Sequence, residues 1–308
     1  MSKSIAIVGA TGLQGGSVLK ALHATGKYRI RGLTRDTTSA SAKAVLEKYP
    51  GVELAKADLD DIDSLRQAFK GADIVFGVTQ FNPTGKPQDR DRDQEYEHGK
   101  AIVNAAIAEG VKSLVFSSLD SMKVNSHGKY PGVKHFESKH EVEEYISSKA
   151  GQIRGYFVYV GFYMENYVNY SRLSPEDGKT VEFTFPLKPT TKLPLVDTAN
   201  DVGYVVSYIL DHPEECLETV IEASSGYYEA QDMVNAFTEV TGIPARYVQI
   251  PYEEYLGTEE MIQMFKGIEE FGLFNGRTEF IERAKEYDHK LTTPTEFWKN
   301  RGWTGPAK

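Results

Sequence analysis

The sequence predicts an α/β fold, in which a doubly wound parallel sheet is joined to a smaller second lobe built from two chain segments. Three observations support this prediction. Short β-branched apolar runs alternate with helical patterns through the first half of the chain, as in βαβ units with right-handed crossovers. The alternation stops after Gly161. One more strand pattern then returns at residues 219–223, which we assign to the main sheet.

The elements of the sheet follow in order from apolar periodicity. Strands are expected at residues 4–8, 29–33, 52–57, 73–79, 113–118, 156–160 and 219–223. Helices are expected after Gly15, at 40–48 and 61–69, from the end of a polar loop (82–91) to Glu109, and at 134–148. Asp61 or Asp63 is the expected cap of the third helix, and Gly110 is the expected stop of the fourth.

The smaller lobe is predicted where the strand–helix rhythm is lost. Residues 162–196 contain several tyrosines, a turn at 175–178 and short strands interrupted by proline. Residues 201–210 have a helical pattern, and the chain from Gln231 onward is mostly helical around a short strand at 247–250.

These patterns predict two domains. Residues 1–161 and 197–224 form the sheet domain, and residues 162–196 and 225–308 form the smaller lobe. A ligand is expected in the cleft between them, beyond the carboxyl ends of the strands.

The composition excludes several classes of function. Acidic residues outnumber basic ones by 44 to 35, which gives a net charge of −9 and a pI near 5.4. A chain without a broad basic surface is not expected to bind nucleic acid directly. Because Cys216 is the single cysteine, no internal disulfide is possible. It stands beside two glutamates and is interpreted as structural. The histidines lack metal-ligand spacing and no Gly-x-Ser-x-Gly motif occurs, so we expect neither a metal site nor a hydrolase.

The sequence also predicts a location in the cell. No apolar run approaches the roughly 20 residues that a membrane-spanning helix needs. The first apolar segment lacks the basic flank of a signal peptide. We therefore expect no membrane association and a cytoplasmic protein, with the nucleus as a second compartment.

Three glycines between the first strand and the first helix indicate a nucleotide site. Gly9 permits a tight turn, Gly12 lets the backbone approach a pyrophosphate, and Gly15 lets helix and strand pack closely. The amides of the first helical turn then face the phosphates. This arrangement favours dinucleotide binding on a Rossmann sheet over an ordinary βα turn. The same turn contains Thr11, Leu13 and Gln14, which are predicted to line the site with the glycines.

The end of the second strand indicates which dinucleotide is preferred. NAD sites usually offer a carboxylate there, whereas NADP needs a cation for its 2′-phosphate. Arg35 can bind a phosphate with its guanidinium, and Thr34 can add a hydroxyl. Asp36 is the competing feature, since it can pair with Arg35 or take the NAD role. We predict NADP(H) in preference to NAD(H).

Two further strand ends are predicted to contact the dinucleotide. Asp58 and Leu59 follow the third strand and are expected at the adenine edge. Thr79, Gln80 and Phe81 close the fourth and are expected along the central part of the dinucleotide.

The order and spacing of several motifs carry a family resemblance over nearly the whole chain. The motifs lie at residues 9–15, 33–35, 52–61, 76–79, 135–145 and 163–166. Together they resemble the NmrA-like family, an atypical branch of the short-chain dehydrogenases. The similarity is strongest up to Asn166 and weaker beyond it. The resemblance implies that Tyr163 and Asn166 line the nicotinamide end of the cleft.

The wider superfamily implies a set of catalytic residues, which this chain matches only in part. It pairs a Ser on the fifth strand with a Tyr four residues before a Lys, and the Lys holds the nicotinamide ribose and lowers the pKa of the Tyr. Here Ser117 and Ser118 end the fifth strand and Lys139 lies in the expected helix, but His135 replaces the Tyr. Lys139, His135 and Ser118 are therefore the candidate catalytic residues, and Ser117 and Lys139 candidate cofactor contacts. His135 can shuttle a proton or have no chemical role.

Two functions remain open at this stage. The resemblance implies a regulatory NADP(H) sensor that binds a protein partner, such as a transcription regulator, and whose two conformations differ in affinity for the dinucleotide. The segments 82–91 and 119–134 are its expected moving parts. The alternative is an NADPH-dependent reductase of a small carbonyl, quinone or aromatic compound that uses Lys139. A homo-oligomer is compatible with the family.

Overall fold

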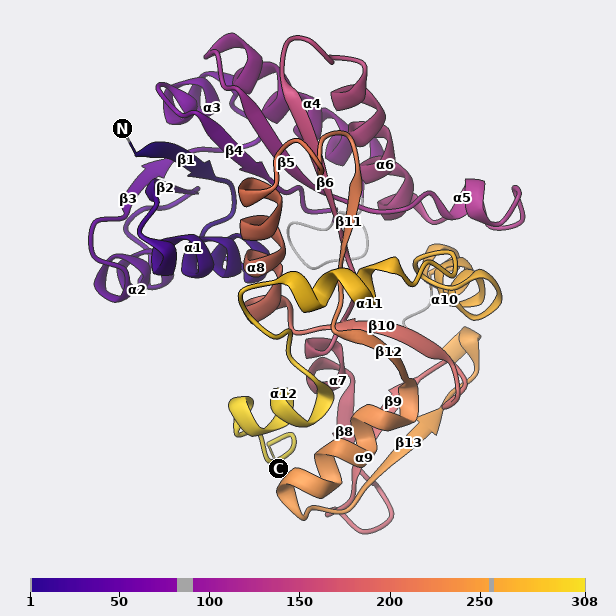
Figure 1. Ribbon diagram of the computed structural model, residues 1–308. Helices are drawn as coiled ribbons and strands as arrows, with labels where there is room; N and C mark the ends of the chain where they lie inside the picture. Colours follow the sequence, from indigo (N-terminus) through magenta and orange to yellow (C-terminus); the bar gives the residue numbers. More distant parts are fainter. Residues whose placement is uncertain (1, 82–90, 255–257, 308) are drawn as a thin grey trace. The chain divides into compact units, whose positions relative to one another are not determined.

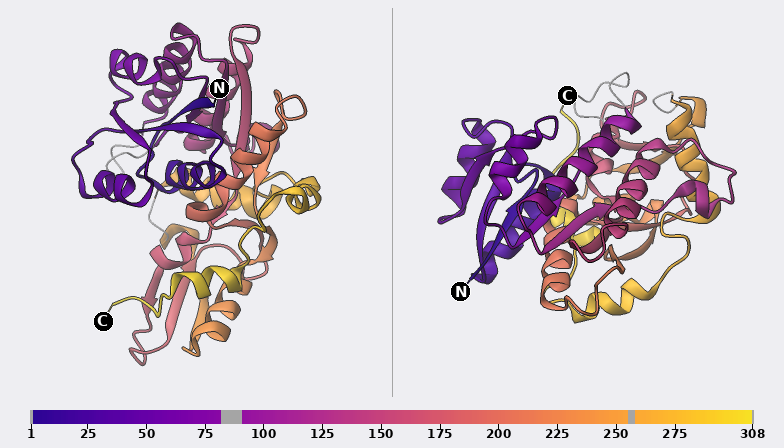
Figure 2. Two further views of the ribbon diagram at one scale, coloured as in Figure 1. Left: turned by 60° about the vertical axis from the view of Figure 1, so that its left-hand side comes forward. Right: turned by 90° about the horizontal axis from the view of Figure 1, so that it is seen from above.

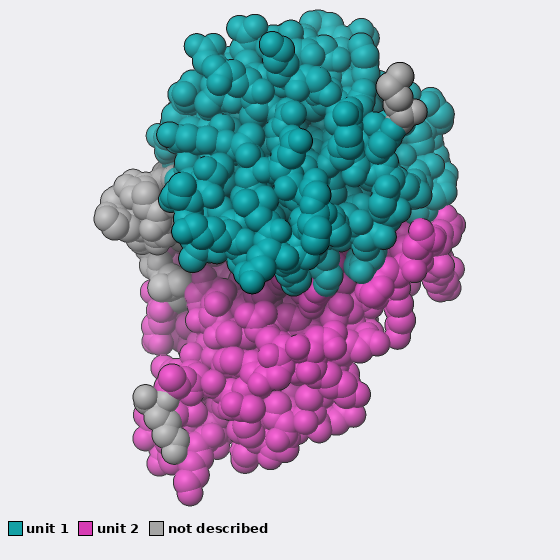
Figure 3. All heavy atoms as spheres, turned by 90° about the vertical axis from the view of Figure 1, so that its left-hand side faces the viewer, with its two compact units in different colours: residues 1–119, 135–159, 202–221 teal, residues 120–134, 160–201, 222–308 magenta. Residues whose placement is uncertain are grey.

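A computed structural model describes residues 2–81, 91–254 and 258–307 (Figure 1). The described residues form two compact units, shown in Figure 3. Unit 1 is built from residues 1–119, 135–159 and 202–221, and unit 2 from residues 120–134, 160–201 and 222–308. The largest difference from the predicted domain boundaries is the segment 120–134, which clusters with unit 2.

The main sheet confirms the predicted α/β fold. Within the described residues seven strands pair in the order β11-β6-β5-β4-β1-β2-β3. They are β1 (Lys3–Ile7), β2 (Tyr28–Thr34), β3 (Glu53–Lys56), β4 (Ile74–Gly77), β5 (Ser113–Ser118), β6 (Arg154–Val160) and β11 (Val220–Ala223). β1 pairs in parallel with both β2 and β4, so the winding direction reverses beside β1. Doubly wound sheets bind ligands at this switch point, beyond the carboxyl ends of the strands.

Helices cover both faces of this sheet (Figures 1 and 2). They are α1 (Leu13–Thr25), α2 (Ala40–Lys48), α3 (Ile62–Phe69), α4 (Arg92–Ala108), α6 (Lys134–Ser147) and α8 (Thr198–Asp211). Buried side chains of α3, α4 and α6 pack into one core with Ala6, Val75 and Leu114 of the strands. On the other face α8 approaches α1 closely, where a Cβ at Gly203 would stand 2.1 Å from the Ser17 carbonyl oxygen.

Several local signals act as expected. The Asp61 carboxylate caps α3 by accepting hydrogen bonds from the Asp63 and Ser64 amides. Gly110 follows α4 with φ +71°, a conformation that suits glycine after a helix. Cys216 is buried and is not part of a disulfide. The short helix α5 (Met122–Asn125) was not predicted. Most of the predicted polar loop, residues 82–90, lies outside the described residues.

The described residues of unit 2 form two small mixed sheets and several helices. One sheet has the order β12-β10-β7, from β7 (Phe162–Tyr163), β10 (Lys192–Val196) and β12 (Gly226–Glu229). The other has the order β13-β9-β8, from β8 (Ser171–Leu173), β9 (Val181–Phe185) and β13 (Ala245–Gln249). The helical elements are α7 (Glu165–Asn169), α9 (Ala230–Thr241), η2 (Tyr252–Glu254), α10 (Glu259–Phe271), α11 (Glu279–Arg283), η3 (Ala284–Glu286) and α12 (Pro294–Arg301).

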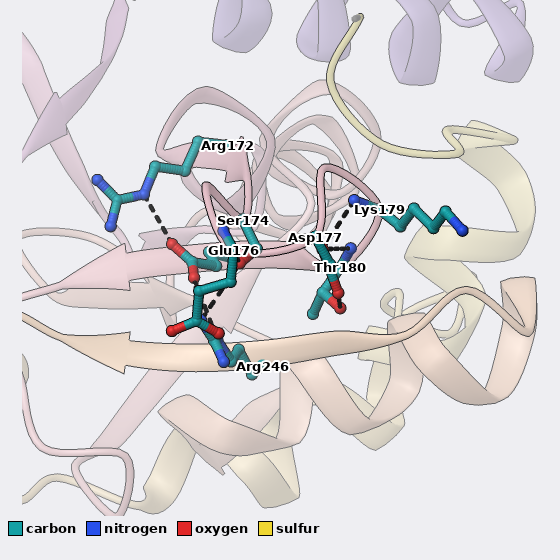
Figure 4. Close-up of polar contacts among 8 residues, drawn as sticks. Arg172, Ser174, Glu176, Asp177, Lys179, Thr180 and Arg246 are labelled. Carbon is teal, nitrogen blue, oxygen red and sulfur yellow. Dashed lines mark hydrogen bonds and ion pairs between the residues drawn. The ribbon is translucent and has the colours of Figure 1, made fainter.

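Aromatic packing and ion pairs around a buried glutamate hold unit 2 together. Tyr167 has no exposed surface and donates a hydrogen bond to the Ala230 carbonyl, so it is a core residue. The Trp298 indole joins α12 to α9. Figure 4 shows the β8–β9 hairpin, whose predicted turn at 175–178 is present. There the nearly buried Glu182 accepts hydrogen bonds from Arg172 and Arg246, which links β9 to β8 and β13.

The segment 120–134 is tied to the α10 region of unit 2. The Gly132 amide donates to Gln263, and Lys129 and Tyr130 both bond to Glu270. These contacts account for its clustering with unit 2, although both neighbouring segments belong to unit 1. Within the described residues, no helix is long and apolar enough to cross a lipid bilayer.

A buried carboxyl group at the start of α8 binds the C-terminal segment of unit 2 through hydrogen bonds. Asp201, near the start of α8, has no exposed surface and accepts hydrogen bonds from the amide and hydroxyl of Thr292. Burial raises the pKa of Asp201 to about 7 from the ordinary 3.8, and the neighbouring charge of Asp197 adds to the increase.

We expect Asp201 to make the stability depend on pH. Because its pKa is higher in the folded state, the folded protein binds more protons than the unfolded chain between about pH 4 and pH 7, and stability falls as the pH rises through that window. Each pH unit costs about 1.4 kcal/mol. Asp201→Asn should flatten this slope and make the protein roughly 2–4 kcal/mol more stable than wild type at pH 8. Urea unfolding between pH 5 and 8 measures this.

The matched control is Asp211→Asn, at the exposed end of the same helix. It should leave the slope as it is in the wild type. A slope that Asp201→Asn does not change would contradict the prediction.

Candidate functional site

The glycine turn has the geometry that the sequence predicts. Gly9 has φ +67°, in the left-handed region, and its carbonyl accepts a hydrogen bond of 2.8 Å from the Gly12 amide. Gly12 occupies the N-cap of α1 and, among the described residues, no side chain caps this end. The first amides of α1 therefore remain available for an anion.

Gly15 sets the distance between α1 and β1. A Cβ at this position would lie 2.3 Å from the Gly9 carbonyl oxygen and 2.6 Å from that of Val8. Only glycine allows the helix to start so close to the strand. Leu13 is 47% exposed, so the turn presents an apolar side chain as well as amides. Thr11 and Gln14 are both partly buried beside it. The contacts of these residues with a cofactor remain predictions.

Arg35 and Asp36, at the end of β2, do not pair with each other. The Asp36 carboxylate accepts hydrogen bonds from the Thr38 amide at 2.8 Å and hydroxyl at 2.6 Å, and these lower its pKa. Arg35 is exposed, and no hydrogen bond or ion pair joins it to another described residue. Both bonds reach the same oxygen, Oδ1, and which dinucleotide this strand end prefers remains a prediction.

The acidic residues that follow β3 are also engaged. The Ala57 amide bonds to the Thr34 carbonyl, so the ends of β2 and β3 lie side by side. Asp58 accepts a hydrogen bond from the Asp60 amide, and Asp60 in turn lies 2.7 Å from His98 Nε2. The contact with His98 lowers the pKa of Asp60. Leu59, between the two acids, is partly buried.

Lys139 reaches the end of β4 from α6. Its ammonium donates hydrogen bonds to the Thr79 carbonyl at 3.1 Å and to the Thr79 hydroxyl at 2.9 Å, and it pairs with Glu95 of α4. Two predicted site residues, Lys139 and Thr79, are thus brought together. Gln80 is exposed beyond them.

The remaining candidate residues, Ser117, Ser118 and His135, lie at the end of β5 and in α6. The Ser118 hydroxyl is buried and donates to the Lys139 carbonyl at 3.2 Å. The Ser117 hydroxyl is buried without a hydrogen-bond partner in the described structure. The His135 ring is partly buried and packs against Phe136 and Phe81, with centroid distances of 4.7 and 5.5 Å.

Tyr163 and Asn166 belong to unit 2 rather than to the unit of the glycine turn. Tyr163 ends β7, in register with Val196 of β10. Asn166 lies in α7, where its carbonyl accepts a hydrogen bond from the Tyr170 amide. Their predicted place at the nicotinamide end of a cleft remains a prediction. No group of three His, Cys, Asp or Glu side chains suited to a metal ion occurs in the part of the chain that the structure describes.

A family model matches residues 1–299, and its family is the NmrA-like family. The chain belongs to the NmrA-like family. This confirms the resemblance drawn from the motifs. Among relatives, the NmrA-like oxidoreductase ptmS of Penicillium ochrochloron is 28% identical, with 80% of this chain and 75% of the relative covered. The oxidoreductase cpsB of Aspergillus campestris is 30% identical with the same coverage.

Solved structures share the fold. The negative transcriptional regulator NmrA in complex with NADP has a TM-score of 0.79 at 23% identity, covering 96% of this chain and 94% of that one. The NADPH-dependent quinone oxidoreductase QOR2 of Escherichia coli, complexed with NADPH, has a TM-score of 0.74 at 21% identity, covering 97% and 100%. NmrA has also been crystallised with NAD, and that structure matches with a TM-score of 0.80 at 22% identity, covering 99% of both chains. The neighbours thus include a regulator as well as a reductase.

Glu95 is the site residue that sequence reasoning missed. It lies in α4 at helical spacing from Gly99, Ile102 and Val103, all of them buried. An acidic side chain on the apolar face of a helix needs a buried partner, and this was the available signal.

We expect alanine at position 15 to be far more harmful than alanine at position 16. The Gly15→Ala methyl group would overlap the backbone of the turn, whereas the Gly16→Ala methyl group would lie 3.5 Å from the Ala10 carbonyl oxygen. Gly15→Ala should cost roughly 2 kcal/mol or more, and Gly16→Ala should gain up to about 1 kcal/mol because helical glycine is unfavourable. Urea unfolding of the two variants measures the difference. Equal stability would show that α1 is not packed against β1 in this way.

Proposed function

We propose that this protein binds NADP(H) at the glycine turn of unit 1 and acts as a regulatory sensor of the dinucleotide. The glycine turn supports binding, since Gly15 allows a helix N-terminus without a side-chain cap to stand at the switch point of the sheet. Gly9, Gly12 and the first amides of α1 would hold the pyrophosphate, and the bound dinucleotide would supply a hydride that can be transferred. NmrA and QOR2, which share the fold, have been crystallised with NADP and NADPH.

The preference for NADP(H) is supported by Arg35. Its guanidinium is exposed and has no hydrogen-bond or ion-pair partner among the described residues, so it can bind a 2′-phosphate. Asp36, which would favour NAD, accepts hydrogen bonds from the Thr38 amide and hydroxyl. Both of these bonds reach Asp36 Oδ1, so the proposed preference rests on the exposed cation of Arg35.

The sensor role is supported by one observation above all: Lys139, in the expected catalytic position, is bound to Glu95 and Thr79, and His135 stands where a tyrosine would donate the proton. Among the described residues near it, the Ser118 hydroxyl is directed to the backbone of α6. This arrangement suits holding a dinucleotide better than donating protons to a substrate. The sensor would act with a protein partner such as a transcription regulator, in the cytoplasm or nucleus, and NmrA itself is described as a negative transcriptional regulator.

A reductase is the second candidate, because ptmS and cpsB are named as oxidoreductases and Lys139 lies in the helix where the superfamily places it. Hydride would pass from NADPH to a small carbonyl, quinone or aromatic compound, with the proton coming from His135, Ser118 or water.

A turnover assay separates the two functions. We expect the protein to bind NADPH without oxidising it when it is offered a panel of carbonyl compounds and quinones, followed at 340 nm or by product analysis. NADPH oxidation that Lys139→Ala abolishes, and that Lys100→Ala on the exposed side of α4 leaves intact, would make the protein a reductase instead.

A binding experiment tests the cofactor preference. We expect NADPH to bind more tightly than NADH in calorimetry, and Arg35→Ala to weaken NADPH about 10- to 100-fold while changing NADH little, since a charge-assisted contact contributes roughly 1.5–3 kcal/mol. Arg29→Ala, at the far end of the same strand, is the control. Equal affinities for the two dinucleotides in the wild type would rule the preference out.

A further inference from the structure

An ion pair is buried within unit 1, between Glu95 of α4 and Lys139 of α6. The Glu95 side chain has no exposed surface, and that of Lys139 is 12% exposed. Removing two charges from water is costly unless each finds good hydrogen-bonding partners. Such a pair persists only where the surrounding residues satisfy both charges.

The Glu95 carboxylate is held at both of its oxygens. Oε1 accepts a hydrogen bond from the Lys139 ammonium and one of 2.9 Å from the Thr79 hydroxyl. Oε2 accepts a hydrogen bond from the Ser138 hydroxyl. The end of β4, α4 and α6 therefore meet at this carboxylate, which has little freedom to turn.

The Lys139 ammonium is occupied to the same degree. It has three hydrogens to donate, and its acceptors among the described residues are Glu95 Oε1, the Thr79 carbonyl and the Thr79 hydroxyl. The carboxylate is the strongest of these acceptors, because hydrogen bonds between charged groups are about twice as strong as neutral ones. An incoming hydroxyl would therefore replace a contact with Thr79 and leave the bond to Glu95 in place.

The Lys139 ammonium lies at the carboxyl ends of the sheet strands, where the glycine turn also lies. Thr79 follows β4, and β4 pairs directly with β1, with Ile7 opposite Phe76. Gly9 follows the carboxyl end of β1. Lys139 and the turn are thus attached to adjacent strand ends within one unit.

We propose that Glu95 is a positioning residue that holds Lys139 for the ribose of the bound dinucleotide. This inference rests on the proposed function of unit 1. The carboxylate fixes the ammonium at the end of β4, and a ribose hydroxyl takes the place of one of the two Thr79 contacts. Glu95 acts through Lys139 and needs no contact with the dinucleotide.

A double-mutant cycle tests this inference. Glu95→Gln keeps the size of the side chain, removes the charge and replaces one acceptor oxygen with an NH2 donor, to which the Ser138 hydroxyl can adapt by accepting. It should weaken NADPH binding at least 10-fold in calorimetry, and in a Lys139→Met background it should weaken binding less than 2-fold. Glu97→Gln, which breaks an exposed pair with Lys100 on the same helix, should leave the affinity unchanged. Equal losses in both backgrounds, or no loss from Glu95→Gln, would overturn the proposal.

A second readout needs no dinucleotide. Labelling of lysines with an amine-reactive ester, followed by mass spectrometry of the peptides, reports how well each ammonium is held. Glu95→Gln should raise the labelling rate of Lys139 at least 5-fold and leave that of Lys112 unchanged, whereas an unchanged rate at Lys139 would overturn the positioning role. If wild-type protein bound no NADPH, the proposed function would fail, and the labelling rate alone would then decide whether Glu95 holds Lys139.

Discussion

The contact between the start of α1 and the end of β1 is the constraint on which the rest of unit 1 depends. The Gly9 carbonyl lies where a side chain at position 15 would have to stand, so the helix can begin one turn after the strand only because Gly15 has no Cβ. That short connection brings the uncapped amides of α1 to the point where the sheet reverses its winding direction. The ends of β2 and β4, with Arg35 and Thr79, flank the same point because their strands pair with β1.

Much of this fold was predictable because its signals are local. Strand and helix periodicity, the Asp61 cap and the glycine at position 110 each act within a few residues, and the structure places them as expected. The segment 120–134 was not predictable in the same way. Its membership of unit 2 depends on Gly132 meeting Gln263 and on Lys129 meeting Glu270, across more than a hundred residues of chain. No periodicity records such a contact.

In the candidate site, too, the features that depend on neighbouring residues were predictable and those that depend on distant residues were not. The glycine turn could be derived from the positions of three glycines, and the competition between Arg35 and Asp36 could be stated but not settled. The structure adds that Thr38 donates two hydrogen bonds to one oxygen of Asp36, and the preferred dinucleotide remains a prediction. Glu95 was missed because its partners lie 16 and 44 residues away, at Thr79 and Lys139. A buried glutamate on an apolar helix face indicates that a partner exists, but only the folded structure shows which residue the partner is.

The Glu95 network also bears on what chemistry unit 1 can support. Reduction of a carbonyl needs a proton as well as a hydride, and the acid that supplies it must reach the substrate oxygen. The hydroxyls of Ser118 and Ser138 are directed to the Lys139 carbonyl and to Glu95, and the ammonium of Lys139 is directed to Glu95 and Thr79. Because these three groups already donate their hydrogens within the protein, they are poorly placed to donate a proton to a substrate. Hydride transfer from a dinucleotide bound here would thus favour acceptors that take their proton from His135 or water, whereas dinucleotide sensing needs no proton at all.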